Sequence, residues 1–226
     1  MEPRIEILDE STHRDLNVDF SEARASYFKR RLIPVVISEF FTLMFHYPIV
    51  FVKDGETGKF SCSVLLGVSD EATLLDDKST EDDEALPLNI RRLPLLAIDH
   101  SPDSEPMIGI NLDSAGINRG DQLFKHDSPE LDSALAALSE LYQGHRETDA
   151  YIKTALELGL VSKLQAEIQF NDKPKVTLEG LYSVDINKVE RLIDGDQKDK
   201  FLTIARYAYA QNFSLYNMRK LTHLKS

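Results

Sequence analysis

Three charged residues in apolar surroundings are the strongest candidates for chemistry in this chain: Glu39, Arg91 and Arg92. Glu39 lies within the apolar run 35–45, where burying an unpaired carboxylate would be costly. Arg91 and Arg92 stand at the start of an apolar segment that continues to Ile98. Because a guanidinium can bind a carboxylate through two parallel hydrogen bonds, we predict that Glu39 pairs with Arg91 or Arg92. The pair would either fix a helix on a sheet or, in a cleft, bind a ligand.

The other residue types that support catalysis or metal binding form no known pattern. None of the six histidines is spaced as H-x-H or H-x-x-x-H: His13, His46, His100, His126, His145 and His223. Residues 99–101 are Asp, His and Ser, but the members of a catalytic triad come from separate segments. The only cysteine, Cys62, alternates with Phe60 and Val64 and is predicted to be a small core residue. The sequence therefore predicts no catalytic residues, no metal site and no cofactor.

The balance of charge limits the classes of partner. The chain has 38 acidic and 26 basic residues and a net charge of −12 at pH 7, whereas nucleic-acid binding needs clustered Lys and Arg. An anionic membrane surface is disfavoured for the same reason. We therefore expect no nucleic-acid partner, and the acidity itself is typical of a well-solvated protein.

The N-terminal residues MEPRIEILDES lack the basic start and the apolar run of a signal peptide. The longest apolar segment, residues 35–45, contains Ser38, Glu39 and Thr42 and is about half as long as a membrane span requires. The sequence therefore predicts a cytoplasmic protein without membrane insertion. It leaves open an association with the cell surface by a non-classical route.

Alternation and turn residues predict two β-hairpins. Residues 49–53 and 60–68 are typical of strands, and the turn residues of Asp54–Gly58 lie between them. The other predicted strands are residues 90–98, 107–112, 164–170 and 176–183, of which the last two form the second hairpin. With the helices, these strands predict an α+β fold, a single domain with a largely antiparallel sheet and packed helices.

Apolar spacing and capping residues predict the helices. The predicted spans are 35–45, 128–141, 148–158, 184–192 and 198–215. Gly144 is predicted to interrupt the apolar stripe before Thr148 starts a new helix, and Gly159 is predicted to end that helix. Asp185 is the expected N-cap of the next. The last helix has aromatic residues that would form either core or an exposed docking face: Tyr207, Tyr209, Phe213 and Tyr216.

The chain divides by composition into an N-terminal arm, residues 1–33, and a single domain, residues 34–226. An acidic loop interrupts the domain at residues 70–86, where eight acidic residues and one lysine fall between Asp70 and Glu84. A block of like charges is usually solvated. The block also lacks the spacing and central glycine of a calcium loop, so no metal site is expected there.

The order of several motifs resembles the SapC family of bacterial proteins. The matching stretches are VVISEFF around Glu39, HYPIVFVKDGETGKFSCSVLLGV, IRRLPLLAI, GDQLF, T-x-x-Y at Thr148, GLYSVDINKVERL and ARYAYAQNFSLYNMRKL. They cover most of residues 34–221, and their number and order make the resemblance specific. The chain departs from the family in having no tryptophan. The resemblance implies a surface-layer-associated name but no assigned activity for many relatives.

These observations favour a non-enzymatic binding or accessory protein of the SapC type, which acts through an unknown protein partner or a small ligand. In that case Glu39, Arg91 and Arg92 are the candidate ligand-binding residues. The alternative is an enzyme whose polar site is assembled from distant segments around Glu39 and Arg91. The sequence is also compatible with a homo-oligomer.

Overall fold

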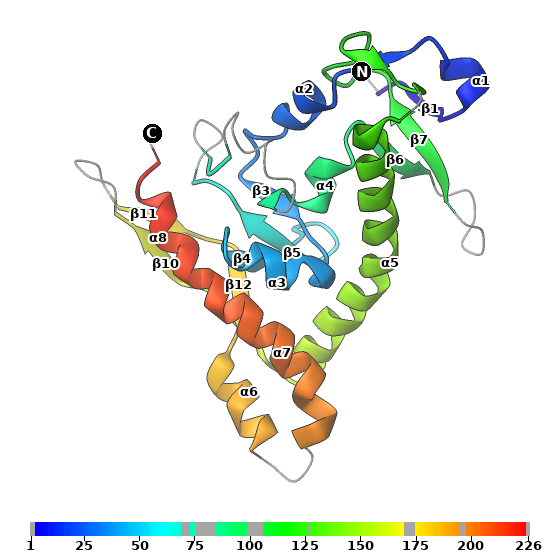
Figure 1. The fold of residues 1–226 in the computed structure, drawn as a ribbon. Helices are drawn as coiled ribbons and strands as arrows, with labels where there is room; N and C mark the ends of the chain where they lie inside the picture. Colours follow the sequence, from blue (N-terminus) through cyan, green and yellow to red (C-terminus); the bar gives the residue numbers. More distant parts are fainter. Residues whose placement is uncertain are drawn as a thin grey trace. The chain divides into compact units, whose positions relative to one another are not determined.

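The computed structural model describes residues 3–68, 73–75, 85–98, 106–125, 127–169, 175–194 and 198–224. Most of the acidic loop predicted at 70–86 therefore lies outside the described residues. The chain forms two compact units: unit 1 comprises residues 1–28 and 76–143, and unit 2 comprises residues 29–75 and 144–226. The sequence instead placed a boundary at residue 33. Both units contain helices and antiparallel strands, so the α+β prediction is confirmed (Figure 1).

Unit 1 contains a three-stranded antiparallel sheet and a separate strand pair. The sheet has the order β1-β7-β6, from β1 (Ile5–Ile7), β7 (Met107–Asn111) and β6 (Leu95–Ile98). The strand pair is β2 (Asn17–Val18) with β8 (Asp121–Gln122), and the short helices are α1 (Glu10–His13), α2 (Phe20–Ala25) and α4 (Leu88–Arg91). The segment predicted as an arm thus supplies β1 and β2. The core of this unit contains Val18, Phe20, Leu95, Ile110, Leu123, Leu131, Ala134 and Leu138.

Helix α4 corrects the prediction of a strand over residues 90–98. The N–H groups of Ile90 and Arg91 both donate to the carbonyl oxygen of Pro87, at 2.8 and 3.0 Å, which closes a helical turn. Strand β6 begins only at Leu95. Pro94 has no N–H to donate to a neighbouring strand, so the apolar run cannot pair through its whole length.

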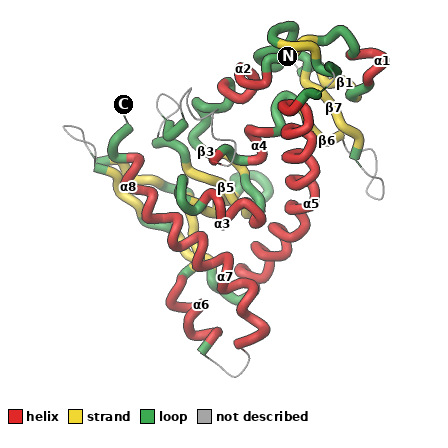
Figure 2. The backbone as a smooth tube through the Cα atoms, viewed as in Figure 1, coloured by secondary structure: helices red, strands yellow, loops and turns green. Residues whose placement is uncertain are grey.

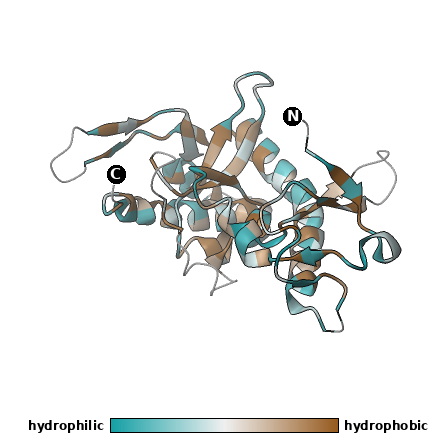
Figure 3. Cartoon of the chain, turned by 90° about the horizontal axis from the view of Figure 1, so that it is seen from above, coloured by the Kyte–Doolittle hydropathy of each residue, from teal (hydrophilic) through white to brown (hydrophobic). Residues whose placement is uncertain are grey.

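Unit 2 contains a five-stranded antiparallel sheet of order β3-β5-β4-β12-β9. Its strands are β3 (Leu32–Pro34), β5 (Phe60–Leu65), β4 (Ile49–Lys53), β12 (Leu181–Val184) and β9 (Val161–Lys163). The first predicted hairpin is confirmed, because β4 and β5 pair from Ile49 opposite Val64 to Lys53 opposite Phe60. Strands account for much of the hydrophobic colour in Figure 3. The core includes Val50, Leu65, Ile168, Leu178, Leu181 and Leu221.

The second predicted pairing is also confirmed, with a difference in extent. Strand β10 (Ala166–Ile168) pairs with β11 (Val176–Leu178) as a two-stranded sheet. Residues 181–183, predicted to continue the second hairpin, instead belong to β12, which lies between β4 and β9 in the large sheet. Val184, predicted to begin the next helix, is the last residue of this strand. Gly180 separates the two strands with a φ of 76°, a conformation that glycine adopts without steric cost.

The remaining helices of unit 2 are η1 (Ile37–Glu39), α3 (Phe40–Leu43), α6 (Ile186–Ile193), α7 (Lys198–Ser214), η4 (Leu215–Asn217) and α8 (Met218–Leu221). The helix predicted over 35–45 is shorter than expected, because Val35 donates its N–H to the carbonyl oxygen of Cys62 and continues the extended chain. Asp185 caps α6 as predicted, accepting from the Asn187 N–H at 3.1 Å. Helix α7 packs against α3, α6, β4 and β12.

One helix, α5 (Pro129–Glu157), replaces the two predicted over 128–158. It is a single uninterrupted red coil in Figure 2, so the break predicted at Gly144 was wrong. The end predicted at Gly159 is confirmed: its φ is +63°, and the N–H of Leu160 donates to the Ala155 carbonyl oxygen at 2.9 Å. Within the described residues, no helix is both long and apolar enough to cross a membrane.

Candidate functional site

Glu39 is buried, with 5% of the residue's surface exposed. It ends the short η1 helix in unit 2, and its Oε2 accepts a hydrogen bond from the Val36 N–H at 2.8 Å. The carboxylate therefore satisfies a donor at the start of its own helical turn. This contact gives Glu39 a structural role that its position in the sequence did not reveal.

Arg91 and Arg92 lie at the end of α4 in unit 1. The Arg92 guanidinium donates to the Asn89 Oδ1 at 3.1 Å and to the carbonyl oxygen of Leu95. Arg92 therefore holds the turn between α4 and β6. The predicted pairing with Glu39 joins residues of two different units, and it remains a prediction.

The turn that contains Glu39 lies directly against α5. The Ile37 N–H donates to the Thr148 Oγ1 at 3.0 Å, and that hydroxyl donates to the Gly144 carbonyl oxygen at 2.7 Å. A Cβ atom on Gly144 would lie 2.7 Å from the Cγ2 atom of Val36. The turn therefore packs closely on α5 at Gly144, and the hydrogen bond from Ile37 to Thr148 holds it there.

An aromatic cluster continues from this contact. The Tyr151 ring lies 6.0 Å from the Phe40 ring and 5.6 Å from the Tyr207 ring, both edge to face, measured between ring centroids. Phe41 lies 5.6 Å from Tyr207, and the Arg206 guanidinium carbon lies 4.6 Å above the Phe41 ring. Edge-to-face pairs are favourable beyond the area that they bury. The cluster therefore joins α3, α5 and α7 in one packed group.

A cavity of about 510 Å³ opens beside this cluster; we call it the aromatic pocket. It is lined by Ile37, Glu147, Ala150, Tyr151, Thr154, Phe201, Thr203, Ile204 and Tyr207. These residues come from η1, the second half of α5 and α7, which are far apart in the sequence. All three elements contain motifs by which the chain resembles a family: VVISEFF, T-x-x-Y and ARYAY.

Tyr151 lines the aromatic pocket, and its hydroxyl is a buried polar group. Tyr151 is 6% exposed, and its hydroxyl forms no hydrogen bond with any described residue. Burial, and to a lesser extent the neighbouring Cys62, raises the pKa of Tyr151 well above its ordinary value. The hydroxyl therefore stays protonated and is free to donate. A buried polar group without a partner is unusual in folded proteins.

Cys62 lies in the core of unit 2, as predicted, with 1% of its area exposed. Burial first, and then the charge of Asp149, raises the pKa of the thiol. Because the thiolate is the nucleophilic form of cysteine, this thiol is not activated for catalysis. In the part of the chain that the structure describes, no group of three or more His, Cys, Asp or Glu residues is placed to hold a metal ion.

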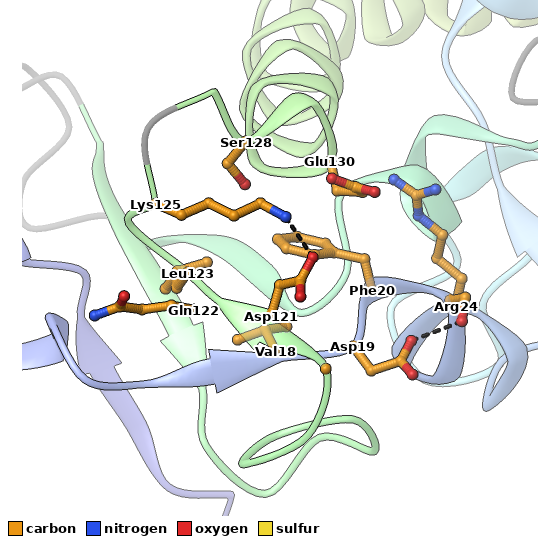
Figure 4. A pocket seen from close by; sticks show the side chains of 12 residues that line it. Val18, Asp19, Phe20, Arg24, Asp121, Gln122, Leu123, Lys125, Ser128 and Glu130 are labelled. Carbon is orange, nitrogen blue, oxygen red and sulfur yellow. Dashed lines mark hydrogen bonds and ion pairs between the residues drawn. The ribbon is translucent and has the colours of Figure 1, made fainter.

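A second, polar cavity of about 410 Å³ lies in unit 1, between α2, β8 and the start of α5 (Figure 4). Asp19 caps α2, accepting from the Ser21 hydroxyl at 2.6 Å and from the Glu22 N–H at 3.0 Å. Asp121 and Lys125 form an ion pair with each other. Buried Arg24 points into the same cavity. Several of its polar groups thus already serve the local fold, which makes this cavity the weaker candidate for a ligand site.

Sequence reasoning therefore identified Glu39 as buried but missed the aromatic pocket next to it. Neither Glu39 nor the two arginines line either of the two cavities described above. The available signal was the T-x-x-Y spacing: Thr148 and Tyr151 lie one turn apart on α5, where one binds the η1 backbone and the other lines the pocket.

Comparison with known proteins gives one finding. The family model described as SapC matches residues 8–221 of the 226-residue chain. The match includes the three segments that form the aromatic pocket, and it extends through parts of both units. No curated protein and no solved structure matches the chain.

Proposed function

We propose that this chain, which belongs to the SapC family, is a non-enzymatic binding protein that holds a small molecule in its aromatic pocket. The observation that supports this most directly is the unpartnered Tyr151 hydroxyl. A polar group buried without a partner costs free energy. A bound molecule with an acceptor oxygen or nitrogen would remove that cost.

The lining defines the chemistry of the ligand. Tyr151, Phe201 and Tyr207 supply aromatic surface. The polar residues of the lining are Glu147, Thr154 and Thr203, and the buried Tyr151 hydroxyl is a hydrogen-bond donor without a partner among the described residues. A volume of about 510 Å³ lies within the usual range for small-molecule sites. We therefore expect an aromatic or aliphatic molecule with a polar acceptor group.

The alternative left open by the sequence, an enzyme built around Glu39 and Arg91, has less support. The Glu39 carboxylate is engaged by the Val36 N–H. The Arg91 side chain is half-buried at the end of a short helix in unit 1. Neither residue lines the aromatic pocket, so a binding role without catalysis agrees better with the arrangement of these groups.

Filling the pocket is expected to weaken binding without unfolding the protein. Ala150 is an exposed residue of α5 that lines the pocket, so Ala150→Phe places a ring in it. With the neutral dye Nile red as probe, fluorescence titration should show saturable binding to the wild type and at least about tenfold weaker binding to the variant. The matched control is Ala136→Phe, an exposed alanine of the same helix outside the pocket. Equal binding by wild type and Ala150→Phe would exclude this pocket as the binding site.

Tyr151→Phe is expected to separate stability from binding. The change removes a buried hydroxyl that has no partner in the described part of the chain, so the free energy of unfolding should rise by about 1 kcal/mol. Affinity for acceptor-bearing probes should fall, because the donor is lost. Urea denaturation measures the first effect, and Tyr142→Phe, an exposed tyrosine on the same helix, is the control. A destabilised Tyr151→Phe would mean that the hydroxyl already has a partner in the folded protein.

A further inference from the structure

We infer that four exposed aromatic residues of unit 2 form a docking surface for an acidic segment of a partner protein that also presents apolar side chains. These residues, which we call the aromatic face, are Phe45, Tyr209, Phe213 and Tyr216. Their exposed fractions are 58%, 41%, 57% and 64%. Exposed aromatic groups gathered in this way are typical of interaction sites. The inference is independent of the aromatic pocket, because none of the four lines it.

The aromatic face is formed by two segments that are far apart in sequence, Phe45 and residues 209–216. Phe45 follows α3, and Phe213 is in the last turn of α7, yet their ring centroids lie 6.1 Å apart at an angle of 70°. Tyr209 lies one helical turn before Phe213 on α7. The face is thus already assembled, and a partner would not have to bring its parts together.

Polar contacts hold the Phe45 backbone and the Tyr216 side chain. The Asn217 Nδ2 donates to the Met44 carbonyl oxygen at 2.7 Å, and the Lys220 Nζ donates to the Phe45 carbonyl oxygen at 3.0 Å. The Arg219 guanidinium lies 3.9 Å from the Tyr216 ring centroid and donates to its hydroxyl. A side chain held in this way, as that of Tyr216 is, loses little entropy on binding, which favours it as an anchor of an interface.

The local charge determines the chemistry of the partner. Residues 201–226 include four basic residues and no acidic one, whereas the whole chain has a net charge of −12. Two of these four, Arg219 and Lys220, contact the aromatic face through Tyr216 and Phe45. A complementary segment therefore has Asp or Glu residues next to apolar side chains.

The test uses a designed helical peptide with Phe and Leu along one face and Glu on either side, and a second peptide in which Lys replaces each Glu. Fluorescence anisotropy with the full chain should show the Glu peptide binding at least about tenfold more tightly than the Lys peptide, with affinity falling as salt is added. Phe213→Ser should weaken binding by about tenfold or more. The matched control is Leu202→Ser, an exposed apolar residue near the start of the same helix, which should bind like the wild type.

Several results would overturn the inference. Binding that is absent, equal for the two peptides, or unchanged in Phe213→Ser would mean that the aromatic face does not recognise an acidic apolar segment. Sedimentation with phosphatidylglycerol vesicles tests a membrane surface as the occupant, and light scattering after gel filtration tests a second copy of this chain. If either association occurs and is lost in Phe213→Ser, that occupant replaces the partner protein.

Discussion

Glu39→Ala is expected to lower the free energy of unfolding by about 3–5 kcal/mol. The side chain is buried, and its loss leaves the Val36 N–H without its acceptor at the start of η1, which alone costs about 1–3 kcal/mol. If Glu39 is paired with Arg91 or Arg92 as predicted, the guanidinium left without its counter-charge would account for the rest. Urea denaturation of the purified variant measures the loss.

Glu39→Gln is the matched variant, since it keeps an oxygen that can accept from the Val36 N–H but removes the charge. If Glu39 is paired with an arginine, this variant should lose most of the same stability. A small loss in Glu39→Gln with a large loss in Glu39→Ala would argue against the ion pair and leave the hydrogen bond as the main role. A loss below about 1 kcal/mol in Glu39→Ala would contradict both roles and restore Glu39 as a ligand-binding candidate.

Gly144→Leu is expected to destabilise the protein by about 3 kcal/mol, although leucine is a far better helix former than glycine. A Cβ at this position already lies 2.7 Å from the Val36 Cγ2 and 2.9 Å from the Val36 Cβ. Val36 is buried and β-branched, so it cannot move aside easily. The larger side chain must push the turn away from α5 and break the hydrogen bond from Ile37 to Thr148.

Ala136→Leu is the control for this substitution, because residue 136 is exposed on the same helix and should change stability by no more than about 0.5 kcal/mol. Gly144→Ala should have an intermediate effect, since it adds the clashing atom but no more. A Gly144→Leu variant as stable as the wild type would contradict the close packing of the turn on α5.

The sequence by itself determined those turns and helix ends that are stabilised by contacts between residues a few positions apart. The hairpin of β4 and β5 depends on Asp54, whose side chain accepts from the Thr57 N–H at 2.6 Å, and on Gly58 with a φ of +70°. Asp185 and Gly159 likewise fix helix ends through bonds to their immediate neighbours. Such local contacts depend on residue type and spacing, so the pattern was sufficient to predict them.

Tertiary packing decided where the local preference of a residue was outweighed, as at Gly144. Glycine costs a helix interior about 1 kcal/mol, which favoured a break at Gly144. The helix continues because the buried positions of α5 run through this residue, from Leu138 and Leu141 to Thr148 and Ile152. The absence of a side chain at Gly144 leaves the space that Val36 occupies. This role cannot be read from the sequence of the helix, because it depends on the neighbouring turn.

The candidate site shows the same division. The position of Glu39 within an apolar run was enough to predict that it is buried, because the apolar residues around it in the sequence are expected in the core. The aromatic pocket was not predictable in this way. Its lining comes from η1, α5 and α7, which contribute residues 37, 147–154 and 201–207. No local rule brings these three segments together, because their contact depends on the shapes of buried side chains. Only the folded structure shows that Tyr151 lines the cavity and that its buried hydroxyl has no partner among the described residues.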